Sequence, residues 1–191
     1  MSAEAREPRQ RLFFALWPSS EARRELSLAT EKVVSACRAR PVPSHNLHAT
    51  LAFLGNVQKL RVPELTCLAG EQAAAFARDA PLSLSLDTLA HWPRPQILCA
   101  LATRPSPDAS ALAAALRDSS AAAGFHPDLK PFRAHVTVAR KVLACPELPP
   151  IAAIVWRFEA FALIDSRTET GGPVYSIVGS WPLVKMQKAR K

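Results

Sequence analysis

Apolar runs and helical patterns alternate along the chain, and the same order occurs twice. Residues 12–16 form a short apolar run typical of a buried strand, and residues 21–37 follow with the apolar spacing of a helix. In the second half, residues 97–101 form a similar strand-like run, and an alanine-rich helix is expected over residues 105–123. This repeat predicts an internal duplication with a pseudo-two-fold axis.

Further strands with a period of two are expected in each half. Residues 82–86 alternate leucine with serine, and residues 158–164 alternate in the same way. Residues 174–181 could pair with the latter after a turn at Gly171–Gly172, and a helix is expected over residues 62–78. Because these strands return to their neighbours through short turns, the pattern predicts a mixed, mainly antiparallel α+β fold rather than a doubly wound one.

A His-x-Thr pair follows the first helix in each half of the chain. The first pair is His48 with Thr50, and the second is His135 with Thr137. Each pair lies in a strand-like run, where residues two apart point to the same face. Because a polar pair on an apolar strand is costly to bury without partners, we expect both pairs to face a cleft. Two-fold symmetry would bring them to one groove.

Two histidines that face each other across a groove suit general acid–base catalysis at a phosphoryl centre. One imidazole can accept a proton from the nucleophile while the other donates a proton to the leaving oxygen. The threonine hydroxyls can donate hydrogen bonds to the non-bridging oxygens, where negative charge accumulates. This arrangement predicts phosphoryl chemistry that needs neither a metal nor any other cofactor.

The charge of the chain agrees with a phosphate-bearing partner. Its 191 residues include 24 Lys and Arg against 16 Asp and Glu, which gives a net charge of +8. A basic surface favours nucleic acid, nucleotides or anionic membrane. The length predicts one domain or a tightly fused pair.

Several other function classes lack their motif. No two glycines stand two residues apart, which excludes G-x-G-x-x-G, and neither a P-loop nor G-x-S-x-G occurs. The four cysteines form no C-x-x-C pair, which argues against a zinc ribbon or a thioredoxin-type site. Neither a signal-peptide core nor an apolar run of membrane-spanning length occurs. We therefore expect a cytoplasmic protein with reduced thiols and no membrane partner.

Two segments resemble the signatures of a known enzyme family. They are residues 46–55, Asn-Leu-His-Ala-Thr-Leu-Ala-Phe-Leu-Gly, and residues 131–140, Pro-Phe-Arg-Ala-His-Val-Thr-Val-Ala-Arg. Both look like the paired motifs of the bacterial RNA 2′,3′-cyclic phosphodiesterases, which were first named 2′-5′ RNA ligases and belong to the two-histidine phosphoesterase superfamily. The likeness covers nearly the whole chain.

The resemblance implies a duplicated, two-lobed α+β fold over residues 1–191, in which mainly antiparallel sheets flank a central cleft and the helices lie outside. It also implies metal-independent hydrolysis of a terminal 2′,3′-cyclic phosphate to a 2′-phosphate. The expected partners are RNA with 2′,3′-cyclic phosphate ends or cyclic nucleotides, and the expected state is a monomer. The basic tail, residues 185–191, is expected to be frayed.

The resemblance also assigns roles to individual residues of the two motifs. His48 would be the proton donor to the leaving 3′-oxygen, and His135 would be the proton acceptor that activates water. Thr50 and Thr137 would hold the phosphate. Arg140 matches an arginine that family members place just after the second motif, although strict strand alternation points it to the opposite face unless a bulge or the strand end re-aims it.

Other residues near the motifs are candidates for binding substrate. Phe132 is expected to bind substrate and is one candidate to stack the terminal base, and Lys130 and Arg133 are candidates to line the approach for RNA phosphates. Many relatives have proline directly before the second histidine, where this chain has Ala134. Further aromatic candidates for stacking the base are Phe53, Trp92, Tyr175 and Trp181. The remaining histidines, His45, His91 and His126, lack a threonine partner and are interpreted as structural or exposed.

Three alternative functions stay open at this point. The same groups could run the reverse reaction, 2′-5′ RNA ligation, although bulk water favours hydrolysis. The duplicated scaffold could also serve as a non-catalytic RNA- or nucleotide-binding module. A zinc hydrolase is less favoured because close His, Cys and Asp ligand spacings are absent.

Overall fold

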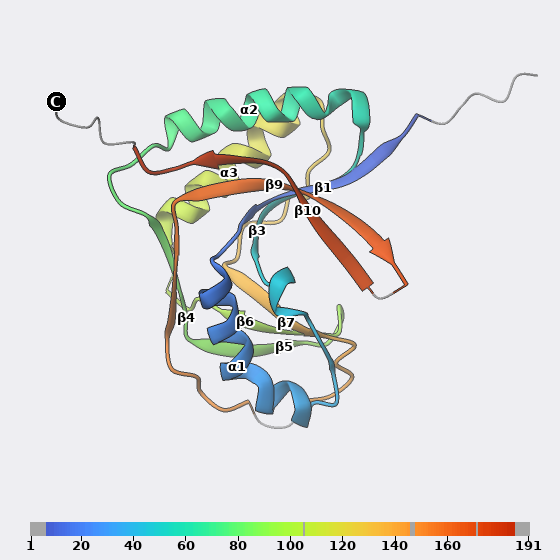
Figure 1. Cartoon of the computed structure of the whole chain (residues 1–191), viewed down its shortest axis with the longest axis vertical. Coiled ribbons are helices and arrows are strands. Elements are labelled where there is room, and N and C mark those ends of the chain that lie inside the picture. Colours follow the sequence, from blue (N-terminus) through green and yellow to red (C-terminus); the bar gives the residue numbers. More distant parts are fainter. Residues whose placement is uncertain (1–6, 105, 146–147, 171, 186–191) are drawn as a thin grey trace, which may run out of the picture.

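Two four-stranded sheets frame the part of the chain that the computed structural model describes, residues 7–104, 106–145, 148–170 and 172–185 (Figure 1). The first sheet has the order β10 (Gly172–Pro182), β9 (Ala160–Glu169), β1 (Arg9–Leu16) and β3 (Ala49–Gln58). The second sheet has the order β2 (Arg40–Pro41), β7 (His135–Arg140), β6 (Ile97–Leu101) and β5 (Thr88–Trp92). A separate ribbon is formed by β4 (Leu82–Leu86) and β8 (Ile154–Phe158). All of these strand pairs are antiparallel, which confirms the predicted fold class.

Parts of three predicted features lie outside the described residues. They are Pro105 at the expected helix start, Gly171 in the expected turn, and residues 186–191 of the expected tail.

Helices cover the outer sides of the two sheets (Figure 1). α2 (Val62–Ala75) and α3 (Pro107–Ala122) pack together against the first sheet, whereas α1 (Ser20–Ala36) packs against the second. Ser19 and Ser106 cap α1 and α3 because each hydroxyl accepts a backbone N–H of the first turn. Two 3-10 turns flank β3: η1 (Ser44–Asn46) and η2 (Lys59–Arg61). None of the described helices is long and apolar enough to cross a membrane.

The alternation of side chains along β1 gives the first sheet two different faces. Leu12, Phe14 and Leu16 are buried in the main core. Phe13 and Ala15 point to the opposite face, where they belong to a smaller buried cluster. The main core therefore holds the helices on one side, and the smaller cluster lies on the side that faces the second sheet.

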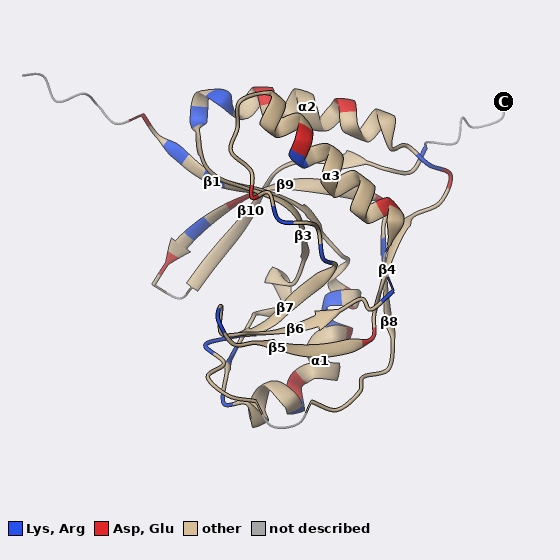
Figure 2. Cartoon of the chain, turned by 180° about the vertical axis from the view of Figure 1, so that it is seen from behind, with Lys and Arg blue, Asp and Glu red and all other residues tan. Residues whose placement is uncertain are grey.

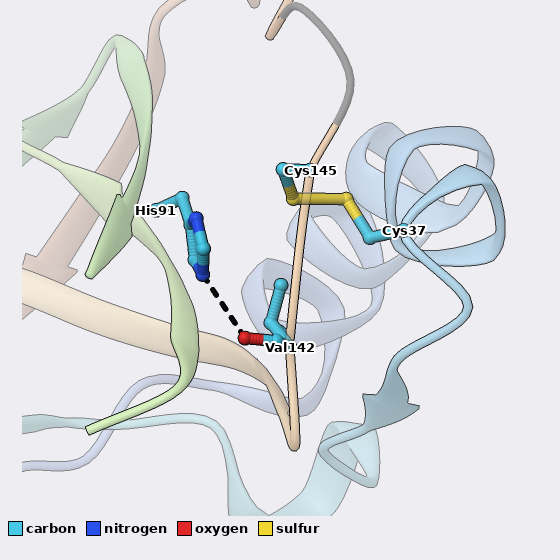
Figure 3. The surroundings of a disulfide bond; sticks show 4 residues. All are labelled: Cys37, His91, Val142 and Cys145. Atoms are coloured by element: carbon cyan, nitrogen blue, oxygen red, sulfur yellow. Dashed lines mark hydrogen bonds between the residues drawn. A yellow bond between two sulfur atoms is a disulfide. The ribbon is translucent and has the colours of Figure 1, made fainter. Parts of the chain in front are cut away.

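A disulfide joins Cys37 and Cys145, which are 108 residues apart in the sequence (Figure 3). Cys37 caps the C-terminus of α1, and Cys145 lies in the loop after β7. The two meet because β2 follows α1 and pairs with β7. His91 of β5 donates a hydrogen bond from Nε2 to the backbone oxygen of Val142 in the same loop, at 3.0 Å. The expectation of reduced thiols is therefore wrong for this pair. The other two cysteines are free: Cys67 and Cys99.

Candidate active site

A cavity of about 320 Å³ lies between the two sheets, and both His-x-Thr pairs line it. His48 immediately precedes β3, which carries Thr50, and β7 carries His135 and Thr137. These two strands belong to different sheets, so the cavity is built from both halves of the duplicated pattern. The structure thus brings together the four residues that the repeat predicted to converge.

Each histidine is held by the same backbone contact. His48 Nδ1 donates a hydrogen bond to Asn46 O at 2.7 Å, and His135 Nδ1 donates one to Arg133 O at 2.7 Å. A carbonyl oxygen can only accept, so Nδ1 carries the proton in both rings. Nε2 is then the ring nitrogen that remains for a substrate in each half of the site.

The aromatic surroundings of the two histidines differ. His48 stacks on Phe13 at 4.9 Å and on Trp17 at 5.3 Å between ring centroids, and the edge of Tyr175 lies at 5.2 Å. His135 has a single aromatic neighbour among the described residues, Trp92, which lies at 4.8 Å with a tilt of 49°. The first imidazole is therefore held more tightly than the second.

Burial lowers the pKa of both imidazoles. For His48 it lowers the pKa to about 4, with further lowering by the charges of Arg140 and His135, while the hydrogen bond to Asn46 opposes the shift. For His135 burial and the charge of Arg133 lower the pKa as well. Both rings are therefore neutral in the free protein at neutral pH. A bound anion would raise either pKa because an opposite charge favours the imidazolium.

A bulge in β7 turns Arg140 toward the cavity. In the pairing of β7 with β6, Thr137 and Ala139 have partners, whereas Val138 between them has none. One extra residue shifts the alternation by one position. Arg140 therefore joins His135 and Thr137 in lining the cavity. This bulge is the exception to strict alternation under which the sequence allows Arg140 to share the face of His135 and Thr137.

β3 has a similar bulge in the first motif. Leu51 has no partner in β1, whereas Thr50 and Ala52 on either side do. Phe53 therefore lines the cavity three residues after Thr50, at the position that Arg140 holds relative to Thr137. The guanidinium of Arg11 lies over the Phe53 ring at 4.9 Å. One motif thus ends in an aromatic ring and the other in a cation.

The described lining of the cavity is cationic. Arg11, Arg40, Arg140 and Lys141 line it, and no Asp or Glu is among the described lining residues. Sequence reasoning missed Arg11 and Arg40. Arg11 could have been predicted from strand alternation, since it stands two residues before Phe13 and shares its face. No pattern in the sequence around Arg40 indicates that this residue lines the cavity. Within the described residues, no group of three or more His, Cys, Asp or Glu side chains could hold a metal ion.

Some predicted substrate contacts are not brought to the cavity. Phe132 packs partly buried against the main core and, with Lys130, lines a separate hollow. Lys130 also pairs with Asp128 at 3.3 Å. Trp181 stacks on Phe161 at 5.6 Å, away from the histidines. Of the other aromatic candidates, two line the cavity and one contacts His135: Phe53, Tyr175 and Trp92.

Known proteins resemble this chain over most of its length. A sequence model of the 2′-5′ RNA ligase superfamily matches residues 16–169. The RNA 2′,3′-cyclic phosphodiesterase of Thermus thermophilus is 32% identical, with 91% of this chain and 90% of the relative covered. The protein of the same name from Escherichia coli is 30% identical, with 92% and 98% covered. The crystal structure of E. coli LigT complexed with 3′-AMP superimposes with a TM-score of 0.82 at 30% identity, covering 92% of this chain and 99% of that one.

Proposed function

The chain belongs to the 2′-5′ RNA ligase superfamily, and from that premise we propose that it hydrolyses terminal 2′,3′-cyclic phosphates of RNA to 2′-phosphates. The observation that carries this proposal is the pair of imidazoles in one cavity, each held through Nδ1 so that Nε2 is available. The cationic lining supports it because the substrate is an anion.

The reaction is an in-line displacement at phosphorus. Water attacks phosphorus, and His135 Nε2 accepts a proton from it as the new P–O bond forms. The bond to the ribose 3′-oxygen breaks on the opposite side, and His48 donates its proton to that oxygen. The product carries a 2′-phosphate and a free 3′-hydroxyl, and solvent then resets both imidazoles.

The substrate itself prepares the proton donor. The low pKa of His48 leaves its imidazole neutral in the free protein. A cyclic phosphate between the two rings carries a negative charge, which raises that pKa and allows His48 to hold a proton. Thr50 and Thr137 donate hydrogen bonds to the non-bridging oxygens, and Arg140 adds a charge-assisted contact there.

The terminal base packs on the Phe53 ring, beside the proposed phosphate position. Phe53 lines the cavity beside Thr50, which places an aromatic face next to the proposed phosphate position. Stacking of one base on an aromatic side chain contributes about 1–3 kcal/mol and tolerates any base. The enzyme should therefore accept all four terminal nucleotides.

We also propose that the protein acts as a monomer in the cytoplasm. The disulfide between Cys37 and Cys145 is the observation against that location, because cytosolic thiols are normally kept reduced. Rapid alkylation of thiols in intact cells tests it. Modification of Cys37 and Cys145 would support the cytoplasm, and protection of both would contradict it.

The activity is tested with 2′,3′-cyclic AMP and with an oligoribonucleotide that ends in a 2′,3′-cyclic phosphate, both in excess EDTA. Phosphorus NMR against 2′- and 3′-phosphate standards should show the 2′-phosphate alone. Pure 3′-phosphate would reverse the roles of His48 and His135. Binding without turnover on both substrates would favour the non-catalytic RNA-binding module, and joined RNA ends would favour ligation.

A further inference from the structure

A strip of cationic and amide side chains continues outward from the cavity along the first sheet. Every residue of β1 has a partner in β3, so β1 keeps its alternation, and Arg9 and Arg11 share the face of Phe13. Their cross-strand partners are Gln58 and Asn56, and directly paired residues project to the same face. We call Arg9, Arg11, Asn56 and Gln58 the β1–β3 strip.

Each residue of the strip lines one of two hollows of the surface. Arg11 lines the histidine cavity, whereas its partner Asn56 lines a second hollow of about 200 Å³ at the β3 edge. Arg9 and Gln58 line this second hollow too, together with Arg61. A molecule bound between the histidines can therefore extend over Arg11 toward Arg9, which lines the second hollow.

The charges of the strip are not neutralised by described carboxylates. No ion pair among the described residues involves Arg9 or Arg11, whereas Arg61 pairs with Glu64 at 2.7 Å. Neither hollow has an Asp or Glu among its described lining residues. In Figure 2 the start of β1 is blue where it leaves the sheet. Guanidinium groups that form no ion pair with a described carboxylate, and that lie beside a cationic cavity, attract a polyanion.

We propose that the β1–β3 strip binds the RNA backbone on the 5′ side of the terminal nucleotide, so that the enzyme prefers oligonucleotide ends to cyclic mononucleotides. This inference rests on the proposed function. Arg9 and Arg11 are about 7 Å apart along an antiparallel strand, so each can bind its own phosphate of an extended RNA strand. The amides of Asn56 and Gln58 can bind phosphate oxygens and 2′-hydroxyls. Such contacts position the strand without reading its sequence.

The opposite rim of the cavity offers a competing path for the RNA. Arg40 and Lys141 line the cavity there, and Arg40 is the cross-strand partner of Arg140. We assign this rim to the terminal phosphate, because Arg140 belongs to the second motif with His135. The RNA chain then leaves on the side of Arg11.

The experiment compares Arg9→Gln with Arg157→Gln, a matched loss of one exposed arginine on β8. Each protein is assayed on 2′,3′-cyclic AMP and on a single-stranded octaribonucleotide with a 2′,3′-cyclic end, at several salt concentrations. Arg9→Gln should lower kcat/KM on the octamer by about three- to tenfold and reduce its salt slope by about one. Its activity on 2′,3′-cyclic AMP should match the wild type, which also shows that it folds. Arg157→Gln should match the wild type on both substrates.

An unchanged octamer kcat/KM in Arg9→Gln would overturn the inference, and so would an equal loss in Arg157→Gln. A selective octamer defect in Lys141→Gln with none in Arg9→Gln would place the RNA on the competing path. Fluorescence anisotropy with a labelled octamer that ends in a 2′-phosphate measures RNA binding without turnover. It therefore tests the β1–β3 strip separately from the proposed hydrolysis. If the wild type hydrolysed nothing, the proposed function would fail, yet weaker octamer binding by Arg9→Gln would still support the strip.

Discussion

At the scale of single residues, the contact that orients His48 reaches outside its own motif. Asn46 O accepts the hydrogen bond from His48 Nδ1, and the buried Asn46 side chain donates through Nδ2 to Pro173 O at 2.9 Å. Pro173 lies in β10, so the position of the imidazole depends on an element far away in the sequence. Asn46 is therefore a positioning residue rather than a catalytic one.

Asn46→Ala should lower kcat on 2′,3′-cyclic AMP by about ten- to hundredfold with little change in KM, because small errors in position are costly in catalysis. Steady-state kinetics measures both constants. Ser44→Ala, at an exposed position of the same 3-10 turn, is the control and should have no effect. A raised KM with an unchanged kcat would contradict the positioning role.

The half-buried imidazole of His48 should make stability depend on pH. Its pKa is about 4 in the folded protein against an ordinary value of 6.5, so the unfolded chain binds the proton more tightly. The stabilisation is therefore complete above pH 6.5 and is lost as the pH falls toward 4, by about 3 kcal/mol. Denaturant unfolding at several pH values should show a shallower dependence for His48→Gln. An equal dependence in both proteins would mean that burial does not shift this group.

At the scale of elements, two bulges decide which side chains reach the cavity. Alternation along the motif strands was sufficient to predict that each histidine shares a face with its threonine. It could not place Phe53 or Arg140, because a bulge depends on the register with a neighbouring strand, as the unpaired Val138 shows. Phe132 was expected to bind substrate, but it precedes β7 and packs against the main core. Strand alternation gives no information about a residue that lies outside the strand.

Phe53→Ala should therefore impair substrate binding, whereas Phe132→Ala should impair stability. Phe53→Ala should raise KM for 2′,3′-cyclic AMP by about fivefold or more, because loss of base stacking costs about 1–3 kcal/mol. Phe132→Ala should leave KM unchanged and lower Tm, because its ring packs against the main core. Kinetics and thermal melting of both variants give the comparison. A KM effect confined to Phe132→Ala would restore the expectation from sequence.

At the scale of the whole molecule, the duplicated pattern predicted that the two halves meet, and the shared cavity agrees with it. The contacts between the halves could not be predicted in the same way. The pairing of β2 with β7 brings Arg40 beside Arg140 and Cys37 beside Cys145. Neither short-range spacing nor composition contains information about a contact between segments a hundred residues apart.

Removal of the disulfide should destabilise the protein without affecting its chemistry. A disulfide typically stabilises a protein by about 2–4 kcal/mol, mainly by restricting the unfolded chain. Cys37→Ser should therefore unfold at lower denaturant concentration than the wild type, and addition of a dithiol reductant should change the wild type in the same direction. Cys67→Ser removes an exposed free thiol and should have no effect. Equal stability of Cys37→Ser and the oxidised wild type would contradict this.

The proposed mechanism depends most on His48 and His135 acting as one acid–base pair. The most direct measurement is the rate of 2′,3′-cyclic AMP hydrolysis by His48→Ala, His135→Ala and the double variant, with folding checked by circular dichroism. Each single variant should lose about 10²–10⁴ in kcat, and the double variant should be little slower than either one, because the two groups act in the same step. A folded single variant that keeps the wild-type rate would contradict the paired mechanism.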